Sequence, residues 1–248
     1  MPFNLSIIHM PPVGYDTNSV LIDNGMDAVV FDPWGRGGSR RSDSKGGWTA
    51  LLNDRKLKLN AIYITHGHFD HIMAVPELVA ETDTPWYIHP ADLPVVEWSN
   101  KILASENLPL IDLEKIPPRP LSPGTIEILP SLSATVIHLP GHSAGGVAFY
   151  FSGSQLNPWG PGFAANAAPR DDTPLLIVGD TLFQNCYGRT DYPTGDKASM
   201  NESLATLYNL DFPDKTRVIH GHGPDTTIGW LRENNSFFTH CKTQKKDL

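Results

Sequence analysis

The sequence predicts one α/β domain over residues 1–248, in which two sheets pack together. Short apolar strands alternate with helical patterns in both halves of the chain, and no linker clearly divides the halves. The length of 248 residues is sufficient for one large core. Hydrophobic residues make up 40% and charged residues 19%, which is ordinary for a globular protein.

The first half is predicted to begin with three strands, at Leu5–His9, Asn18–Asp23 and Asp27–Asp32. An Asp-Asn-Gly sequence between the last two indicates a hairpin. Asn60–Thr65 carries a continuous apolar run, typical of a strand that is covered on both faces. The other elements expected here are helices over Trp48–Lys56 and Pro76–Thr82, a strand over Pro85–His89, and a helical or irregular region over 91–123.

The second half is predicted to contain five further strands and two helices. Met200, Leu204 and Leu207 recur at helical spacing, and Thr226 or Thr227 can cap the last helix. The predicted strands are Thr125–Leu129, Ala134–Leu139, Val147–Phe151, Leu175–Val178 and Arg217–Ile219, and the predicted helices are Asp196–Leu210 and Ile228–Asn235.

Charge and composition exclude several classes of function. With 27 acidic and 19 basic residues the formal net charge is −8, and there is no basic stripe, so no nucleic-acid partner is expected. No apolar run is long enough to span a bilayer, and the N-terminus lacks a signal-peptide pattern. The two cysteines, Cys186 and Cys241, form no disulfide framework. A cytoplasmic protein without a membrane partner is therefore expected.

The segment 65–71, Thr-His-Gly-His-Phe-Asp-His, is the densest chemical feature of the chain. It follows a predicted strand directly, where ligands gather in layered α/β folds. In an extended segment residues two apart point the same way, so His66 and His68 can reach one metal together. If the chain then turns into a helix, Asp70 and His71 can point at a neighbouring position. Imidazoles and carboxylates suit Zn²⁺, Fe²⁺ or Mn²⁺.

Three later residues can complete the set of ligands. His142, Asp180 and His222 each follow a predicted strand and lie beside glycine, which allows the backbone to approach a site closely. A divalent metal lowers the pKa of a bound water from about 15.7 to about 7, and so supplies a nucleophile at neutral pH. The pattern therefore indicates a metal-dependent hydrolase.

These motifs, in this order, resemble the metallo-β-lactamase superfamily, and within it the short bacterial form of glyoxalase II, the hydroxyacylglutathione hydrolases. The resemblance implies a four-layer αββα sandwich with two packed mixed sheets. Only residues 223–248 follow the last motif, so the C-terminal helical glutathione-binding domain of full-length members is not expected. The matching segments are His66-Gly-His68-Phe-Asp70-His71, Pro-Gly-His142-Ser, Gly-Asp180-Thr-Leu-Phe, Gly-Arg189-Thr-Asp and Gly-His222-Gly-Pro.

The resemblance implies two divalent metal ions, with zinc as the first choice and iron or manganese as alternatives. A metal-bound hydroxide would attack the carbonyl of a small, hydroxyacyl-glutathione-like thioester, and Asp70 would be catalytic by orienting or deprotonating the water. The implied ligands are His66, His68 and His142 for the first metal, Asp70, His71 and His222 for the second, and Asp180 as the bridge.

Other residues near the motifs have two readings each. Tyr187 and Arg189 are candidate substrate contacts; the alternatives are packing for Tyr187 and a structural ion pair with Asp191 for Arg189. Cys186 has no neighbouring base and is expected to be a buried thiol. His220 is expected to be structural, with contact to metal or substrate as the open alternative.

Substrate choice is expected to depend on the loops 35–47 and 152–174. Two other activities fit the same ligands. The sequence also resembles persulfide dioxygenases, which use one iron, and lactone or β-lactam hydrolysis would need the same site. The loop residues of interest are Arg36, Arg40 and Arg41 for a substrate carboxylate, and Trp34 and Trp159 for a cleft wall or surface packing.

Overall fold

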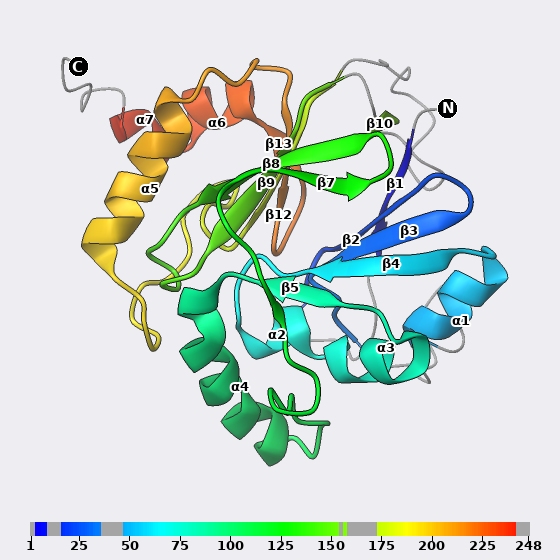
Figure 1. The fold of residues 1–248 in the computed structure, drawn as a ribbon. Coiled ribbons are helices and arrows are strands. Elements are labelled where there is room, and N and C mark those ends of the chain that lie inside the picture. The colour runs from blue at the N-terminus through cyan, green and yellow to red at the C-terminus, as the bar shows by residue number, and fades with distance from the viewer. Residues whose placement is uncertain (1–2, 9–15, 36–46, 154–155, 158–172, 242–248) are drawn as a thin grey trace.

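Two mixed β-sheets pack together at the centre of the molecule, and helices cover the outer face of each sheet (Figure 1). This is the predicted four-layer αββα arrangement. The structure is a computed structural model, and it describes residues 3–8, 16–35, 47–153, 156–157 and 173–241.

The first sheet has seven strands and contains the predicted hairpin. β2 and β3 are antiparallel, and the Asn24 amide donates to the Asp27 carbonyl in the turn, where Gly25 has a φ of +88°. β3, β4 and β5 are parallel, so their carboxyl ends lie at one edge of the sheet. In spatial order the strands are β10 (Leu156–Asn157), β1 (Phe3–Ile8), β2 (Ser19–Asp23), β3 (Asp27–Phe31), β4 (Lys58–Tyr63), β5 (Trp86–Ile88) and β6 (Arg119–Pro120).

The second sheet has six strands. β7, β8 and β9 form an antiparallel meander, whereas β11 and β12 are parallel to each other. In spatial order the strands are β13 (Thr226–Thr227), β12 (Arg217–His220), β11 (Leu175–Gly179), β9 (Val147–Phe151), β8 (Leu132–His138) and β7 (Gly124–Leu129).

The helices form two outer layers. Figure 1 shows α1 to α4 beside the first sheet and α5 to α7 beside the second. The Thr227 hydroxyl accepts a hydrogen bond from the Trp230 amide and so caps α6, as predicted. The helices are α1 (Gly47–Asp54), α2 (Phe69–Ile72), α3 (Val75–Thr82), α4 (Leu93–Ser105), α5 (Lys197–Asn209), α6 (Ile228–Asn234) and α7 (Ser236–His240), with a 3₁₀ turn at Pro90–Asp92.

The alternation of side chains along the strands builds three apolar layers. On β3, Val30 packs toward the first helical layer, whereas Val29 packs between the sheets. On β11, Leu176 packs toward the second helical layer, whereas Ile177 packs between the sheets. Both sheets are therefore covered on both faces, which explains the continuous apolar runs in the sequence.

The structure adds elements that the sequence did not define. Helix α4 and strand β6 lie in the region 91–123, and β10 lies in the segment 152–174 that the sequence predicted as loop. Strands of two residues are too short to show a periodic pattern. Trp34 is 1% exposed and packs in the core beneath the first sheet, so it neither lines a cleft nor lies on the surface. None of the described helices is both long and apolar enough to span a membrane.

Candidate metal centre

Seven ligand-type side chains converge where strands of both sheets end. The segment 65–71 follows β4 and turns into the short helix α2, which carries Asp70 and His71 as predicted. His142 lies in the turn between β8 and β9, Asp180 follows β11 and His222 follows β12. An isolated bridge between Thr17 and His222 joins the two sheets at this edge.

The ligand atoms form three overlapping groups, in each of which they lie within 4.8 Å of one another. The first, called the three-histidine group below, contains His66, His68 and His142. The second combines His66 and His71 with Asp180. The third, called the Asp70 group, contains Asp70, His71 and His222. Together these groups contain the seven residues that the sequence proposed as metal ligands, and no others.

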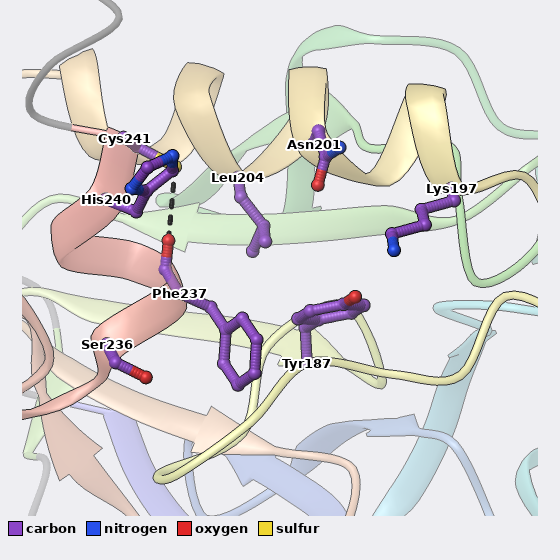
Figure 2. A pocket seen from close by; sticks show the side chains of 8 residues that line it. All are labelled: Tyr187, Lys197, Asn201, Leu204, Ser236, Phe237, His240 and Cys241. Atoms are coloured by element: carbon purple, nitrogen blue, oxygen red, sulfur yellow. Dashed lines mark hydrogen bonds between the residues drawn. The ribbon is translucent and has the colours of Figure 1, made fainter.

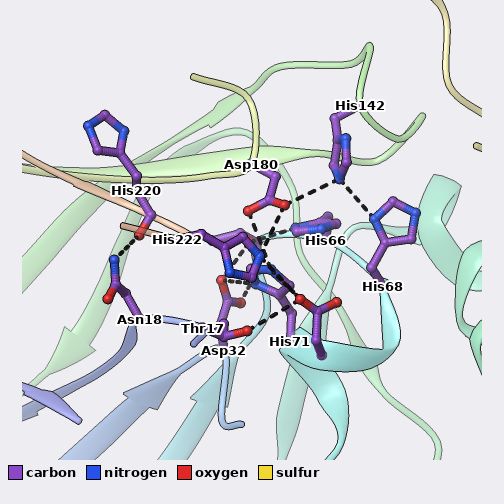
Figure 3. A network of polar contacts seen from close by, with 12 residues as sticks. Thr17, Asn18, Asp32, His66, His68, His71, His142, Asp180, His220 and His222 are labelled. Atoms are coloured by element: carbon purple, nitrogen blue, oxygen red, sulfur yellow. Dashed lines mark hydrogen bonds and ion pairs between the residues drawn. The ribbon is translucent and has the colours of Figure 1, made fainter. Parts of the chain in front are cut away.

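The Asp180 carboxylate lies between the three-histidine group and the Asp70 group (Figure 3). Its Oδ2 atom is 3.6 Å from His142 Nε2 and 3.4 Å from His222 Nε2. Its Oδ1 atom is 3.4 Å from His71 Nε2. This placement suits a carboxylate that bridges two ions.

Hydrogen bonds fix which nitrogen of two histidines can bind a metal. His142 Nδ1 is 2.7 Å from the Arg189 carbonyl, and His71 Nδ1 is 2.9 Å from Asp32 Oδ2. Because both partners accept and cannot donate, Nδ1 carries the proton in each ring. The lone pair of each neutral imidazole is then on Nε2, which faces the cluster.

The cluster also contains buried atoms whose hydrogen-bonding capacity is unused. His66 Nε2, His71 Nε2 and Asp180 Oδ1 have no hydrogen-bond partner among the described residues. Buried polar atoms are almost always satisfied, so such a concentration needs an explanation. These three atoms are a ligand set for one divalent cation, and the donor chemistry therefore fits a metal site.

Gly221 shows how closely the backbone approaches the cluster. A Cβ atom at this position would overlap Asp180 Oδ1 and lie 2.8 Å from the Cε1 atom of His71. Only glycine therefore fits between β12 and His222.

The three-histidine group is electrostatically suited to hold its rings neutral. Burial, together with the neighbouring histidines, lowers the pKa of His66 well below its usual value. Burial and the adjacent His142 lower the pKa of His68 to about 3. His68 Nδ1 and His142 Nε2 face each other at 2.9 Å, so a proton there would meet a second nitrogen and no carboxylate.

The Asp70 group has the opposite character. Burial alone would lower the pKa of His71, but the carboxylates of Asp180, Asp70 and Asp32 raise it well above its usual value. Burial would likewise lower the pKa of His222, but hydrogen bonds to Asp180 and Asp70 raise it to about 10. Without a metal, protons on these rings balance the carboxylates.

Two buried carboxylates that the sequence analysis missed hold the ligand segments in place. Asp32 Oδ1 accepts from the Thr65 amide at 2.7 Å, and its Oδ2 accepts from the Thr65 hydroxyl at 2.6 Å as well as from His71. Asp92 Oδ2 accepts from the Gly67 amide at 2.7 Å and the Ser143 hydroxyl at 2.9 Å. Asp92 Oδ1 accepts from the amide of residue 145 at 2.5 Å, so Asp92 joins the segments that carry the three-histidine group.

A cavity of about 270 Å³ opens above the cluster. Polar atoms of the cluster form its floor, and apolar side chains form its walls. The sequence analysis did not identify the two largest wall residues, Trp98 on α4 and Tyr192. Its lining comprises His68, Phe69, Asp70, Trp98, Ile102, His142, Asp180, Phe183, Arg189, Tyr192 and His222.

The structure separates the two candidate substrate contacts. Arg189 lines the cavity and also forms the ion pair with Asp191 that was its alternative role, at 2.6 Å. Tyr187 lies elsewhere, in a pocket between α5 and α7 (Figure 2). Its ring packs edge-on against Phe237 with centroids 4.9 Å apart. This placement argues against a direct substrate contact by Tyr187 and favours packing.

Two further predictions have clear outcomes. Cys186 is exposed, so the prediction of a buried thiol was wrong: the hydrogen-bonded turn between Leu182 and Tyr187 holds it at the surface. His220 is buried outside all three ligand groups, and its ring points away from the cluster in Figure 3. Its Nδ1 donates to the Leu182 carbonyl at 2.5 Å, which supports the structural role.

Four of the proposed loop residues, Arg36, Arg40, Arg41 and Trp159, lie outside the described residues.

Comparisons with known proteins agree with this geometry. A family model described as the metallo-β-lactamase superfamily matches residues 12–156. Hydroxyacylglutathione hydrolase GloC of Haemophilus influenzae is 29% identical over 237 residues, which cover 94% of this chain and 97% of GloC. The crystal structure of TTHA1623 in a di-iron-bound form is 32% identical with a TM-score of 0.70, and covers 94% of this chain and 99% of its own. The BLEG-1 B3 metallo-β-lactamase is 29% identical with a TM-score of 0.67, with coverage of 95% and 99% respectively.

Proposed function

The chain belongs to the metallo-β-lactamase superfamily of metal-dependent hydrolases, and on this premise we propose that it hydrolyses small thioesters. One observation carries the proposal of a hydrolytic site. Seven ligand-type side chains form the floor of a single cavity, with Asp180 between the three-histidine group and the Asp70 group. Similarity to GloC over nearly the whole chain supports a thioester as the bond that is cleaved.

In the proposed site, the three-histidine group and the Asp70 group would each hold one divalent ion, and Asp180 would be shared. Such ions, when bound, lower the pKa of a water to about 7 and polarise a carbonyl group. Asp70 borders the cavity, so its carboxylate can orient a water there and accept its proton. Thr17 donates to Asp70 Oδ2 at 3.3 Å and so holds that carboxylate in place.

The leaving group makes little demand on the protein. A thiol has a pKa of about 8.5, so a thiolate departs near neutral pH without a strong general acid. Consistent with this, the described lining of the cavity contains no lysine, and its one arginine is already paired with Asp191.

The test is a substrate panel applied to the native protein together with metal quantitation. S-acetyl-N-acetylcysteamine and S-lactoylglutathione report thioester hydrolysis, and free thiol is measured. We expect stoichiometric zinc, iron or manganese and metal-dependent thiol release. Absence of bound metal, or no turnover of any thioester, would refute the proposal.

The same panel covers the alternative activities. Similarity to BLEG-1, a B3 metallo-β-lactamase, makes a cephalosporin the first alternative substrate, followed by a lactone. Oxygen uptake with glutathione persulfide, in a protein that contains one iron per chain, would instead indicate a persulfide dioxygenase.

A further inference from the structure

The walls of the cavity have a consistent chemical character. Five half-buried apolar side chains line it above the cluster, and four of them are aromatic. Half-buried aromatic side chains around a cavity leave apolar surface for a ligand to cover. The five residues are Phe69, Trp98, Ile102, Phe183 and Tyr192.

Trp98 and Tyr192 form a continuous wall beside the three-histidine group. Their ring centroids are 5.4 Å apart, with 43° between the ring planes. Both contact His68, with centroid distances of 5.8 Å from Trp98 and 5.3 Å from Tyr192. A flat apolar group that packs on this wall therefore lies next to the proposed reacting centre.

The Tyr192 ring is held in position before any ligand binds. The guanidinium of Arg189 lies 4.0 Å from the centroid of this ring, and Arg189 Nη1 is 2.9 Å from the Tyr192 hydroxyl. The other donors of Arg189 bind Asp191 at 2.7 Å and 2.6 Å. Arg189 thus supports the wall, and its charge is already balanced by a carboxylate.

The opposite side of the cavity is also apolar. Phe183 lies beside His222 of the Asp70 group, with ring centroids 6.1 Å apart. The volume of about 270 Å³ lies below the range of about 300–1,000 Å³ that is common for small-molecule sites. Glutathione carries two carboxylates, whereas the described lining offers only the arginine that already pairs with Asp191.

We propose that the preferred substrates are compact thioesters with an aryl or branched alkyl group beside the carbonyl or the sulfur, packed against Trp98 and Tyr192. This inference rests on the proposed thioester hydrolysis and defines its substrate class. Hydroxyacyl-glutathione thioesters are then poor substrates.

The experiment compares matched thioesters with the metal-loaded protein. S-phenylacetyl- and S-acetyl-N-acetylcysteamine differ only in the acyl group, and benzyl and 2-hydroxyethyl thioacetate differ only in the thiol. We expect kcat/KM to be at least tenfold higher for the aryl member of one or both pairs. S-lactoylglutathione should be turned over less efficiently than that aryl thioester.

Variants test whether Trp98 produces the preference. Trp98→Ala should reduce the ratio of aryl to non-aryl kcat/KM about tenfold, mainly through KM, while metal content stays unchanged. Trp98→Phe keeps an aromatic face and should retain most of the ratio. Trp230→Ala removes a half-buried tryptophan on α6, outside the cavity, and should leave the ratio as in the native protein.

The possible outcomes separate the two proposals. If thioesters are hydrolysed with equal efficiency in both pairs, or if S-lactoylglutathione is the best substrate, the inferred substrate class is wrong and thioester hydrolysis stands. A ratio that Trp98→Ala does not change also overturns the inference. If no thioester is hydrolysed, the proposed function itself fails, and the substrate class fails with it.

Discussion

The three-histidine group and the Asp70 group are neighbours that share Asp180, yet they differ in the charge that surrounds them. His66 and His68 face other imidazoles, and their pKa values are lowered. His71 and His222 face carboxylates, and their pKa values are raised. The first group is therefore deprotonated and ready for a cation at neutral pH, whereas a cation must displace protons from the second.

The supporting carboxylates differ in the same way. Asp32 binds a ligand ring directly, through His71 Nδ1, and so sets both the orientation and the charge of the Asp70 group. Asp92 binds only backbone amides and the Ser143 hydroxyl, and so sets where the segments of the three-histidine group lie. Four substitutions or conditions test this difference, and they are ordered by the size of the expected effect.

The largest effect is expected for Asp180→Asn, because this carboxylate contacts both groups. Loss of its charge should lower thioester turnover by more than the about 100-fold that loss of an outer contact can cause. Metal analysis should show that occupancy falls in both groups. Asp191→Asn, in an exposed carboxylate nearby, is the control and should keep full metal content. Full occupancy in Asp180→Asn would contradict the shared role.

Asp32→Asn should weaken the Asp70 group selectively. The carboxylate accepts three hydrogen bonds, and an amide has only one oxygen to accept them. Metal affinity of the more weakly bound ion should fall about 10- to 100-fold, as for other outer contacts of a ligand histidine. Calorimetric titration of the metal-free protein resolves the two binding steps. An equal loss in both steps would show that the two groups are not separately supported.

Asp92→Asn should weaken the three-histidine group, and by less, because Asp92 touches no ligand ring. At least one of its three donors loses its acceptor in a fully buried position, which costs about 1–3 kcal/mol of folding stability. Thermal unfolding of the metal-free variant measures this cost. An unchanged unfolding temperature, together with unchanged affinity in the tighter step, would remove Asp92 from the account.

The smallest effect is on the pH dependence of the metal-free protein. The pKa of His222 is raised to about 10 in the folded chain, against about 6.5 when unfolded. Its contribution to stability is therefore complete below about pH 6.5 and is lost as pH rises toward 10. Denaturant unfolding from pH 6 to 10 should show this decline. Metal-loaded protein should not decline in the same way, because the metal replaces the proton.

The ligands were predictable because they follow apolar strands and lie in short, dense motifs. Asp32 carries the same signal, an acidic residue directly after the strand β3, and could have been found by it. Asp92 and Trp98 could not, because their roles depend on where α4 packs, and nothing local in the sequence encodes that position. Tyr187 lies close to Asp180 in sequence, but its ring packs on Phe237 of α7. Proximity in sequence to a motif therefore did not predict proximity to the site.

The central claim is that these seven residues form a two-metal centre that hydrolyses thioesters. Its most direct test is to remove the metal, add zinc back in measured equivalents, and follow hydrolysis of S-acetyl-N-acetylcysteamine alongside proton release. The account predicts two binding steps per chain. The tighter step should release few protons near pH 7, the weaker step should release more, and turnover should be complete only after the second. A single step, or full turnover in the metal-free protein, would contradict it.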